Sequence, residues 1–296
     1  IPFFTYYSMF GFQRIGDLAW AAADMRVKGF MLGATAGRTT LAGEGLQHQD
    51  GNSLLLSYTI PNLISYDPAF AYELAVIIRD GIYRMYEKQE DVYYYITIMN
   101  ENYPMPKMPE GSKEGILKGM YKFKASEKKN SKVKANLMGS GTIMNEVIKA
   151  AEILESKYNV ASDVWSVTSY KLLHLDAQET ERWNMLNPDK KEKSSYIGEI
   201  TKGEKGVFIA ASDYVQIIGD SLAKWLPAPL HTLGTFGFGR SEGRDSLRDF
   251  FEVDAKHIVY ATLYSLVKEK QLKPEVLKKA KKELGINPDK PNPAKS

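Results

Sequence analysis

Short apolar runs alternate with longer amphipathic segments along the first third of the chain. The apolar runs are rich in aromatic and β-branched residues, and they predict strands at 3–7, 29–35, 62–65 and 92–98. Between them, apolar residues recur at helical spacing and predict helices over 13–26 and 67–86. Pro68 falls in the first turn of the second helix, where proline is tolerated. This alternation is typical of a parallel sheet covered by helices.

The pattern is interrupted between residues 104 and 134. Pro104, Pro106 and Pro109 are incompatible with a regular strand ladder. A short helix is predicted over 112–119, and 126–134 is a polar run rich in lysine. Charge runs of this kind are usually solvated, so we interpret the stretch as a linker. The predicted domains are therefore 1–103 and 135–296, with a linker at 104–134.

Beyond the linker the alternation resumes. Strands are predicted at 135–138, 164–167, 207–210 and 232–233, and helices over 143–157, 177–184, 214–225, 254–268 and 273–284. The predicted fold class is therefore α/β, with two three-layer domains built on mostly parallel sheets.

The segment 37–53 follows a predicted strand and shows no helical period. Four glycines allow its backbone unusual conformations, and it carries His48 and Glu44. Open α/β sheets bind their ligands in loops at the carboxyl ends of strands, so this loop is a candidate site. It matches neither the dinucleotide nor the P-loop fingerprint. On spacing alone, a surface role for a lone histidine in a polar loop stays open.

Composition narrows the function classes. The chain is 44% hydrophobic and 25% charged, values typical of a soluble globular protein. A net charge of +3 gives no support for a nucleic-acid partner, and charges or glycines interrupt every apolar run well short of the roughly 20 residues of a membrane span. The absence of cysteine excludes disulfides and thiolate metal sites and fits a cytoplasmic location. We expect neither nucleic acid nor membrane as a partner.

Several sequence blocks, in order along nearly the whole chain, carry a family resemblance. They are YYSMFGFQRIGD at 6–17, GRTTLAGEGLQHQDG at 37–51, SYDPA at 65–69, ERWNML at 181–186 and GFGRS at 237–241. The chain resembles the homodimeric bacterial pyruvate dehydrogenase, the thiamine-diphosphate-dependent decarboxylating component of the pyruvate dehydrogenase complex. The resemblance places residues 1–103 in part of the pyrimidine-binding thiamine-diphosphate domain, and 135–296 in the transketolase-like C-terminal domain. It also implies a chain that starts mid-domain and is inactive alone.

The resemblance implies roles for five residues. Tyr7, Phe10 and Arg14 correspond to cofactor-binding positions, and His48 corresponds to the active-site histidine, with Glu44 able to orient it. From the residues alone, Tyr7 and Phe10 could equally be core aromatics, and Arg14 could form an ordinary salt bridge.

The glycine–aspartate–glycine element that holds magnesium and diphosphate in the family is missing here. We therefore expect the Mg²⁺ site outside this segment and no metal ligands within it. The remaining histidines, at 174, 231 and 257, are interpreted as structural. Asn52 and Phe236 stand where close relatives often carry a histidine and an acid.

The implied activity is decarboxylation of pyruvate on thiamine diphosphate, followed by reductive acetylation of a lipoyl group. The implied partners are a second copy of the chain in a homodimer and the lipoyl-bearing acetyltransferase component. Two alternatives stay open: another thiamine enzyme such as a transketolase, and a non-catalytic binding or assembly module.

Overall fold

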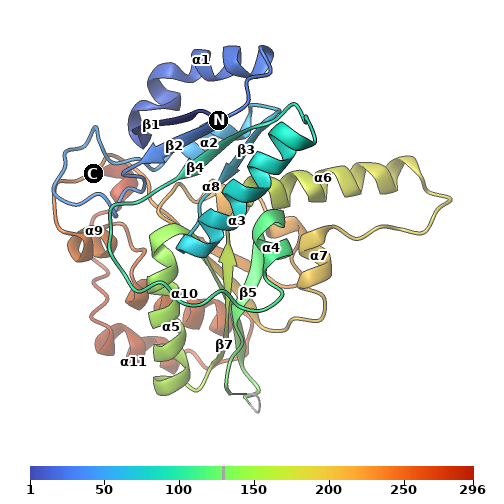
Figure 1. Cartoon of the computed structure of the whole chain (residues 1–296). Coiled ribbons are helices and arrows are strands. Elements are labelled where there is room, and N and C mark those ends of the chain that lie inside the picture. Colours follow the sequence, from blue (N-terminus) through green and yellow to red (C-terminus); the bar gives the residue numbers. More distant parts are fainter. Residues whose placement is uncertain (129–130) are drawn as a thin grey trace.

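The computed structural model describes residues 1–128 and 131–296, so positions 129–130 of the predicted lysine-rich run lie outside the described residues. Figure 1 shows the arrangement of the elements. In chain order they are β1 (Phe3–Tyr7), α1 (Phe12–Asp24), β2 (Phe30–Ala34), α2 (Ser53–Tyr58), β3 (Leu63–Tyr66), α3 (Ala71–Ile82), β4 (Tyr93–Thr97), α4 (Lys113–Lys118), β5 (Met120–Lys124), β6 (Lys134–Gly139), α5 (Met144–Lys157), β7 (Ala161–Val167), α6 (Tyr170–Leu186), α7 (Tyr196–Ile200), β8 (Val207–Ala211), α8 (Ile217–Asp220), β9 (Leu230–Leu233), α9 (Arg244–Phe250), α10 (Ala255–Lys268) and α11 (Glu275–Glu283).

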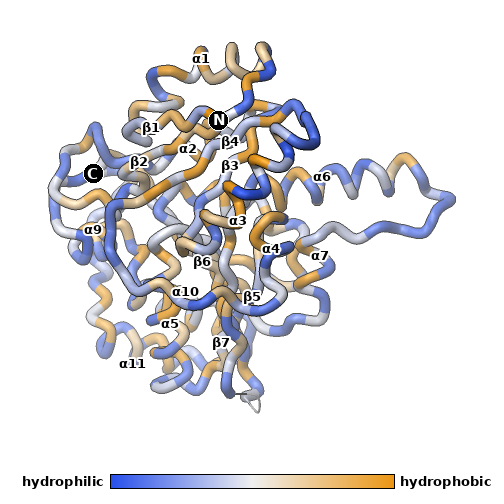
Figure 2. The backbone as a smooth tube through the Cα atoms, viewed as in Figure 1, coloured by the Kyte–Doolittle hydropathy of each residue, from blue (hydrophilic) through white to orange (hydrophobic). Residues whose placement is uncertain are grey.

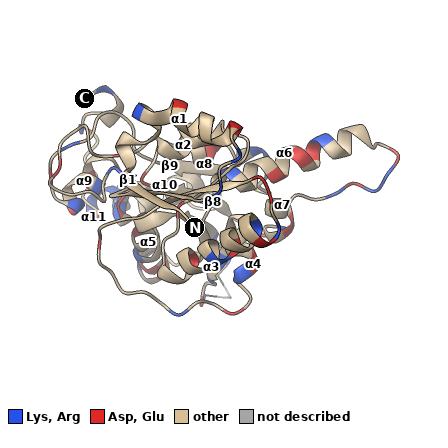
Figure 3. Ribbon diagram, turned by 45° about the horizontal axis from the view of Figure 1, so that its top comes forward, with Lys and Arg blue, Asp and Glu red and all other residues tan. Residues whose placement is uncertain are grey.

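The first sheet has the strand order β1-β2-β4-β3, and all of its neighbouring strands are parallel. Helices α1 and α2 lie on one side of these strands, and α3 and α4 lie on the other (Figure 3). A central strand covered on both faces is buried throughout, which explains the unbroken run of large residues in β4. Strand β1 is at the edge, and its Phe3 and Phe4 side chains are exposed.

The second sheet has the order β5-β7-β6-β8-β9. Its strands pair in parallel except β5, which is antiparallel to β7. The predicted α/β fold class with mostly parallel sheets is therefore confirmed.

Residues 104–134 contain more structure than the predicted linker. Helix α4 and strand β5 lie within them, and β5 forms an edge of the second sheet. Lysines of the predicted linker are partly engaged: Lys122 Nζ lies 2.8 Å from Asp163 Oδ2 and 2.6 Å from Glu204 Oε1. Lys134 Nζ pairs with the same two acids. Charged side chains are common on edge strands, where they discourage pairing with other chains, so composition concealed this strand.

The two sheets meet at the carboxyl ends of their strands. The Asp67 N–H after β3 donates a 2.8 Å hydrogen bond to the Thr168 carbonyl after β7. The Ser169 hydroxyl donates a 2.7 Å bond to the Ser65 carbonyl. A single apolar cluster also includes Tyr94 of the first sheet and Trp165 of the second. The two halves therefore share a core.

Helix α6 projects from this body (Figure 1). It begins at Tyr170, earlier than the predicted 177, because the Ser169 hydroxyl caps it by accepting from the Leu172 N–H. The segment that follows α6 and leads back to the body of the molecule is mostly hydrophilic (Figure 2). Within residues 1–128 and 131–296, no helix combines the length and apolar character needed to cross a bilayer.

Candidate functional site

The turn after β1 presents two aromatic rings. Tyr7 ends β1, a 3₁₀ helix covers Ser8–Phe10, and α1 follows. The Tyr7 and Phe10 ring centroids are 5.7 Å apart. Gly11 closes this turn, where an added Cβ would lie 2.2 Å from the Tyr6 ring. A larger residue at position 11 would therefore require the Tyr6 ring to move, so this close approach favours glycine in the turn.

The loop 37–53 leaves the neighbouring strand, β2, at the same edge of the sheet. It brings the His48 ring to 5.6 Å from the Tyr7 ring and 5.2 Å from the Phe10 ring, measured between centroids. The Arg14 guanidinium carbon lies 4.1 Å from the Phe10 centroid, a cation–π contact. With Glu44 beside His48, the structure brings all five sequence-predicted site residues together.

The His48 imidazole is only partly engaged. Its side chain is 25% exposed, and Nδ1 is buried with no hydrogen-bond partner among the described residues. Glu44 Oε2 lies 3.7 Å from this nitrogen, beyond hydrogen-bond distance. Glu44 thus stands close enough to influence the ring but does not hold it. A buried polar atom without a partner is uncommon in native proteins and is consistent with a ligand or water at this position.

The carboxylate of Asp50, a residue without a predicted role, joins the two parts of the site. Asp50 Oδ1 accepts 2.9 Å hydrogen bonds from the backbone N–H groups of Asn52 and Ser53. Asp50 Oδ2 accepts from the hydroxyls of Ser8 and Ser53. Ser8 lies between Tyr7 and Phe10, so Asp50 connects the aromatic turn to the His48 loop. The signal in the sequence was present: an aspartate that bonds to backbone two and three residues on is a frequent way to begin a helix, here α2.

Residues of the second domain hold the loop by hydrogen bonds. Asp213 Oδ1 accepts from the Thr39 N–H at 2.9 Å, and Oδ2 accepts from the Thr40 N–H at 3.0 Å. Gln49 Oε1 accepts a 2.7 Å bond from the Arg240 N–H. The ends of the loop are buried, and exposure is concentrated at the tip, 43–47. The position of His48 therefore depends on both domains.

Arg38 is a buried cation near the start of this loop. Burial lowers its pKa, while the carboxylates of Asp50 and Asp213 act in the opposite direction. Its side chain donates to the Gly237 carbonyl in the second domain. The preceding Gly37 has a φ of +92°, and a Cβ there would lie 2.4 Å from Asp213 Oδ2. This part of the loop therefore requires glycine for both conformational and spatial reasons.

A three-residue group with metal-like spacing lies elsewhere. Among the described residues, Asp249, Asp254 and His257 have ligand atoms within 4.8 Å of one another. His257 Nδ1 is 2.6 Å from Asp254 Oδ1, and Lys256 Nζ is 2.5 Å from Asp249 Oδ1. Basic side chains therefore already lie against the carboxylates of both acids.

Comparison with known proteins identifies the family of this chain. Residues 1–106 match the model of the pyruvate dehydrogenase E1 component middle domain, and residues 119–254 match that of the transketolase-like TK C-terminal domain. The pyruvate dehydrogenase E1 component of Pseudomonas aeruginosa is 51% identical over 294 residues, and that of Escherichia coli strain K12 is 53% identical over 295 residues. Each alignment covers 99% of this chain and 33% of the relative. The chain thus spans about a third of the length of these relatives.

A solved structure shows the same fold at low sequence identity. The transketolase of Campylobacter jejuni aligns with a TM-score of 0.65 and 19% identity, over 89% of this chain and 35% of that one. That likeness concerns architecture alone. The sequence relationship is much closer. Two family models match the chain in order, and about half of its residues are identical in the relatives named above. The chain therefore belongs to the pyruvate dehydrogenase E1 component family and carries sequences of its middle domain and its transketolase-like C-terminal domain.

Proposed function

We propose that this chain supplies the aminopyrimidine side of a thiamine diphosphate site, in an enzyme that decarboxylates pyruvate and reductively acetylates a lipoyl group. The observation that carries the proposal is the convergence of His48 with the rings of Tyr7 and Phe10. Two loops from adjacent parallel strands build this cluster at the carboxyl edge of the first sheet, where α/β proteins bind their ligands.

The residues present fit the cofactor. Tyr7 and Phe10 provide the aromatic wall that a heteroaromatic ring requires, and Tyr7 is 42% exposed, so part of its surface is open to a ligand. Arg14 already occupies a position over the Phe10 ring. The Phe10 surface left for the cofactor is therefore the part that Arg14 does not cover. The unpartnered His48 Nδ1 adds a polar atom at the same place.

His48 acts on the substrate side in this proposal. When bound, thiamine diphosphate supplies the electron sink for loss of carbon dioxide from a 2-oxo acid. The His48 imidazole, positioned by Asp50 through its loop, donates a proton to or accepts one from the substrate oxygen. Glu44 Oε2, 3.7 Å from Nδ1, places a carboxylate beside the ring without a hydrogen bond to it. The Tyr7 and Phe10 rings exclude water from one side of the imidazole.

In this proposal the enzyme also uses a metal ion, a second subunit and a partner protein. Magnesium and the diphosphate are held by the glycine–aspartate–glycine element expected outside this segment. The enzyme functions in the cytoplasm as a homodimer and transfers its acetyl group to the lipoyl-bearing acetyltransferase component. Family membership, with relatives named as the E1 component of pyruvate dehydrogenase, supports this assignment.

A direct assay tests the proposal with the protein expressed in full from its gene. Cofactor binding is followed by fluorescence titration with thiamine diphosphate and Mg²⁺, and turnover by release of labelled carbon dioxide from pyruvate with ferricyanide as electron acceptor. We expect cofactor-dependent decarboxylation, with pyruvate preferred over longer 2-oxo acids. Mass spectrometry of a lipoyl domain incubated with the protein then detects acetylation.

Two outcomes would replace the proposal. Transfer of a two-carbon unit from a ketose phosphate, without decarboxylation of pyruvate, would make the protein a transketolase. Failure to bind thiamine diphosphate at any concentration, in a folded protein, would make it a binding or assembly module.

A further inference from the structure

Both ends of the His48 loop are attached to one short segment of the second domain, which follows β8. At the first end, the Arg38 N–H donates a 3.4 Å hydrogen bond to the Asp213 carbonyl. At the other end, the Gly51 carbonyl accepts a 3.0 Å bond from the Val215 N–H. The two ends of the loop therefore converge at the domain junction, and His48 lies between them in the sequence.

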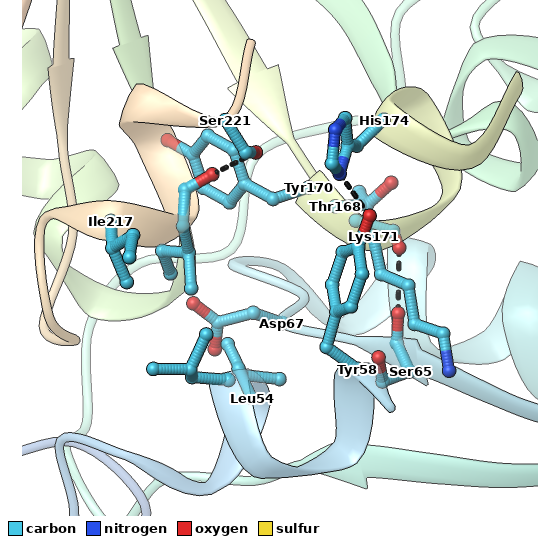
Figure 4. A pocket seen from close by; sticks show the side chains of 13 residues that line it. Leu54, Tyr58, Ser65, Asp67, Thr168, Tyr170, Lys171, His174, Ile217 and Ser221 are labelled. Carbon is cyan, nitrogen blue, oxygen red and sulfur yellow. Dashed lines mark hydrogen bonds between the residues drawn. The ribbon is translucent and has the colours of Figure 1, made fainter. Parts of the chain in front are cut away.

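The chain that follows the loop is anchored to the second domain as well. Helix α2 ends beside α6, where the Tyr58 hydroxyl is hydrogen-bonded to His174 Nδ1 (Figure 4). Lys171 Nζ, also on α6, donates hydrogen bonds of 2.6 to 3.0 Å to three backbone carbonyls of the segment 57–63. These bonds fix the far end of α2. The position of the loop therefore depends on the contacts at its own two ends.

The Arg38 side chain fills the space between the two ends of the loop. It is 2% exposed, and its Nη1 donates to the Gly237 carbonyl of the second domain. A Cβ built on Gly51 would lie 2.5 Å from both Nε and Nη2, so this edge of the guanidinium packs directly against the Gly51 backbone. The Phe251 ring centroid is 5.7 Å from Arg38 Cζ. One planar group at the start of the loop therefore touches both its end and the second domain.

Charge compensation alone does not account for this arginine. Asp50 and Asp213 act on it through charge, but the hydrogen bonds described above for each carboxylate come from hydroxyls and backbone N–H groups. Arg38 Nε is buried and has no hydrogen-bond partner among the described residues. A buried donor left unpaired costs stability, so an arginine at this position indicates a role in function.

The His48 ring depends on the loop for its position. Its Nδ1 has no hydrogen-bond partner among the described residues, and Glu44 lies beyond hydrogen-bond distance. The loop backbone therefore positions the ring, together with its contacts to the Tyr7 and Phe10 rings. Misplacement of a reacting group by about 1 Å can lower a rate by about 100-fold, so a small shift of the loop would be enough to slow the reaction.

We propose that Arg38 is a positioning residue, whose planar guanidinium holds the two ends of the His48 loop against the second domain and so keeps His48 beside its aromatic neighbours. The consequence for turnover rests on the proposed function, whereas the hold on the loop is a property of the fold. Shape matters here as well as charge, because a lysine would keep the charge but lacks the flat edge that packs on Gly51.

Gly51→Ala tests the contact without changing any charge. The φ of Gly51 lies outside the left-handed region, so alanine suits the backbone, and the added methyl group displaces the guanidinium. With the protein expressed in full, we expect kcat for pyruvate to fall about tenfold or more, whereas KM and the dissociation constant of thiamine diphosphate stay near those of the parent. Gly243→Ala is the matched control, because an added Cβ there meets no described atom within 4 Å.

Arg38→Lys tests the same contact from the other side. It keeps the charge, removes the planar edge and should lower kcat to a similar extent. Since both changes act on one contact, the double variant with Gly51→Ala should have a kcat close to that of either single variant. Arg84→Lys is the control for loss of a guanidinium, because Arg84 is a partly buried arginine that pairs with Glu90 in the first domain. Circular dichroism checks the fold of each variant, and either single variant suffices if the other does not fold.

Limited proteolysis follows the loop without cofactor or substrate. The Glu44 side chain is 40% exposed at the tip of the loop, so the protease Glu-C cuts after it when the loop leaves its place. Mass spectrometry measures the rate of cleavage between Glu44 and Gly45. We expect this rate to rise severalfold in both variants of the contact and to stay near that of the parent in the two controls.

Three results distinguish the role of Arg38 from the proposed function. Unchanged kcat in both variants of an active protein, or independent effects that multiply in the double variant, would overturn the role of Arg38 in the reaction. Unchanged cleavage after Glu44 would overturn its hold on the loop. A parent protein that lacks turnover with pyruvate, but whose variants are cleaved faster, would overturn the proposed function and retain the hold of Arg38 on the loop.

Discussion

The Ser8 hydroxyl donates a hydrogen bond to the carboxylate of Asp50, a residue 42 positions further along the chain. Ser8 also lies 3.0 Å from the Tyr95 hydroxyl, which in turn donates to Ser53 at 2.7 Å. Four buried polar side chains therefore form one network between the turn after β1, the His48 loop and the central strand β4. This network sets the distance between His48 and the aromatic rings.

Asp50→Asn should destabilise the protein and disturb the site. The carboxylate accepts two hydroxyls and two backbone N–H groups, and an amide in its place directs its own N–H group toward donors. We expect a loss of about 1–3 kcal/mol in the free energy of unfolding, measured by urea denaturation. Turnover should fall as well. Asp24→Asn, at the exposed end of α1, is the control. Stability and turnover equal to those of the parent would refute the positioning role of Asp50.

His48→Ala should lower turnover while affinity for thiamine diphosphate stays near that of the parent protein. Loss of a positioned acid–base group typically costs roughly 100-fold in rate. Steady-state turnover with pyruvate and fluorescence titration of the cofactor measure the two effects separately. Gln47→Ala, at the exposed tip of the same loop, should retain turnover. A variant that loses cofactor affinity first would assign His48 to cofactor binding.

Phe10→Ala should weaken cofactor binding. The ring contacts Tyr7, His48 and Arg14, and its removal takes away an aromatic contact worth on the order of 1 kcal/mol beyond the lost area. The expected increase in the cofactor dissociation constant is about fivefold or more. Phe4→Ala is a suitable control, since this ring lies exposed on β1 and contacts Tyr6. An unchanged dissociation constant would make Phe10 a packing residue only.

Asp67 should make stability decline as the pH rises from about 4 to about 7. Burial raises its pKa from 3.8 to about 7, so over this range the folded state retains a proton that the unfolded state has released. The free energy of unfolding attributable to Asp67 is therefore fully present below pH 4 and is lost as the pH rises through 7, by up to about 4 kcal/mol.

Comparison with Asp67→Asn isolates this contribution. The pKa values of Glu73 and Asp213 are also raised by burial, so the parent protein alone reports several acids at once. Urea unfolding of both proteins at pH 4, 5, 6 and 7 should give a difference that grows in favour of the asparagine variant. Parallel pH profiles would show that Asp67 is charged in the folded state throughout.

The sequence alone determined most regular elements and the family. The long periodic segments became α1, α3, α5 and α10, and the apolar runs became strands of two mostly parallel sheets. These signals are local, because helical spacing and apolar runs report on the burial of residues a few positions apart. The ordered sequence blocks identified the family, and they selected five residues that the structure then placed in one cluster.

Tertiary structure alone decided what depends on distant contacts. Strand β5 was concealed by its lysines, of which Lys122 pairs with Asp163 and Glu204 far along the chain. Helix α2 is too short to show a helical period. The order β1-β2-β4-β3 brings the first turn beside the His48 loop, and the second domain fixes that loop through the Asp213 carboxylate and the Arg240 N–H. Pairing between strands and hydrogen bonds between buried polar groups join residues tens to hundreds of positions apart, and no local pattern encodes such pairs.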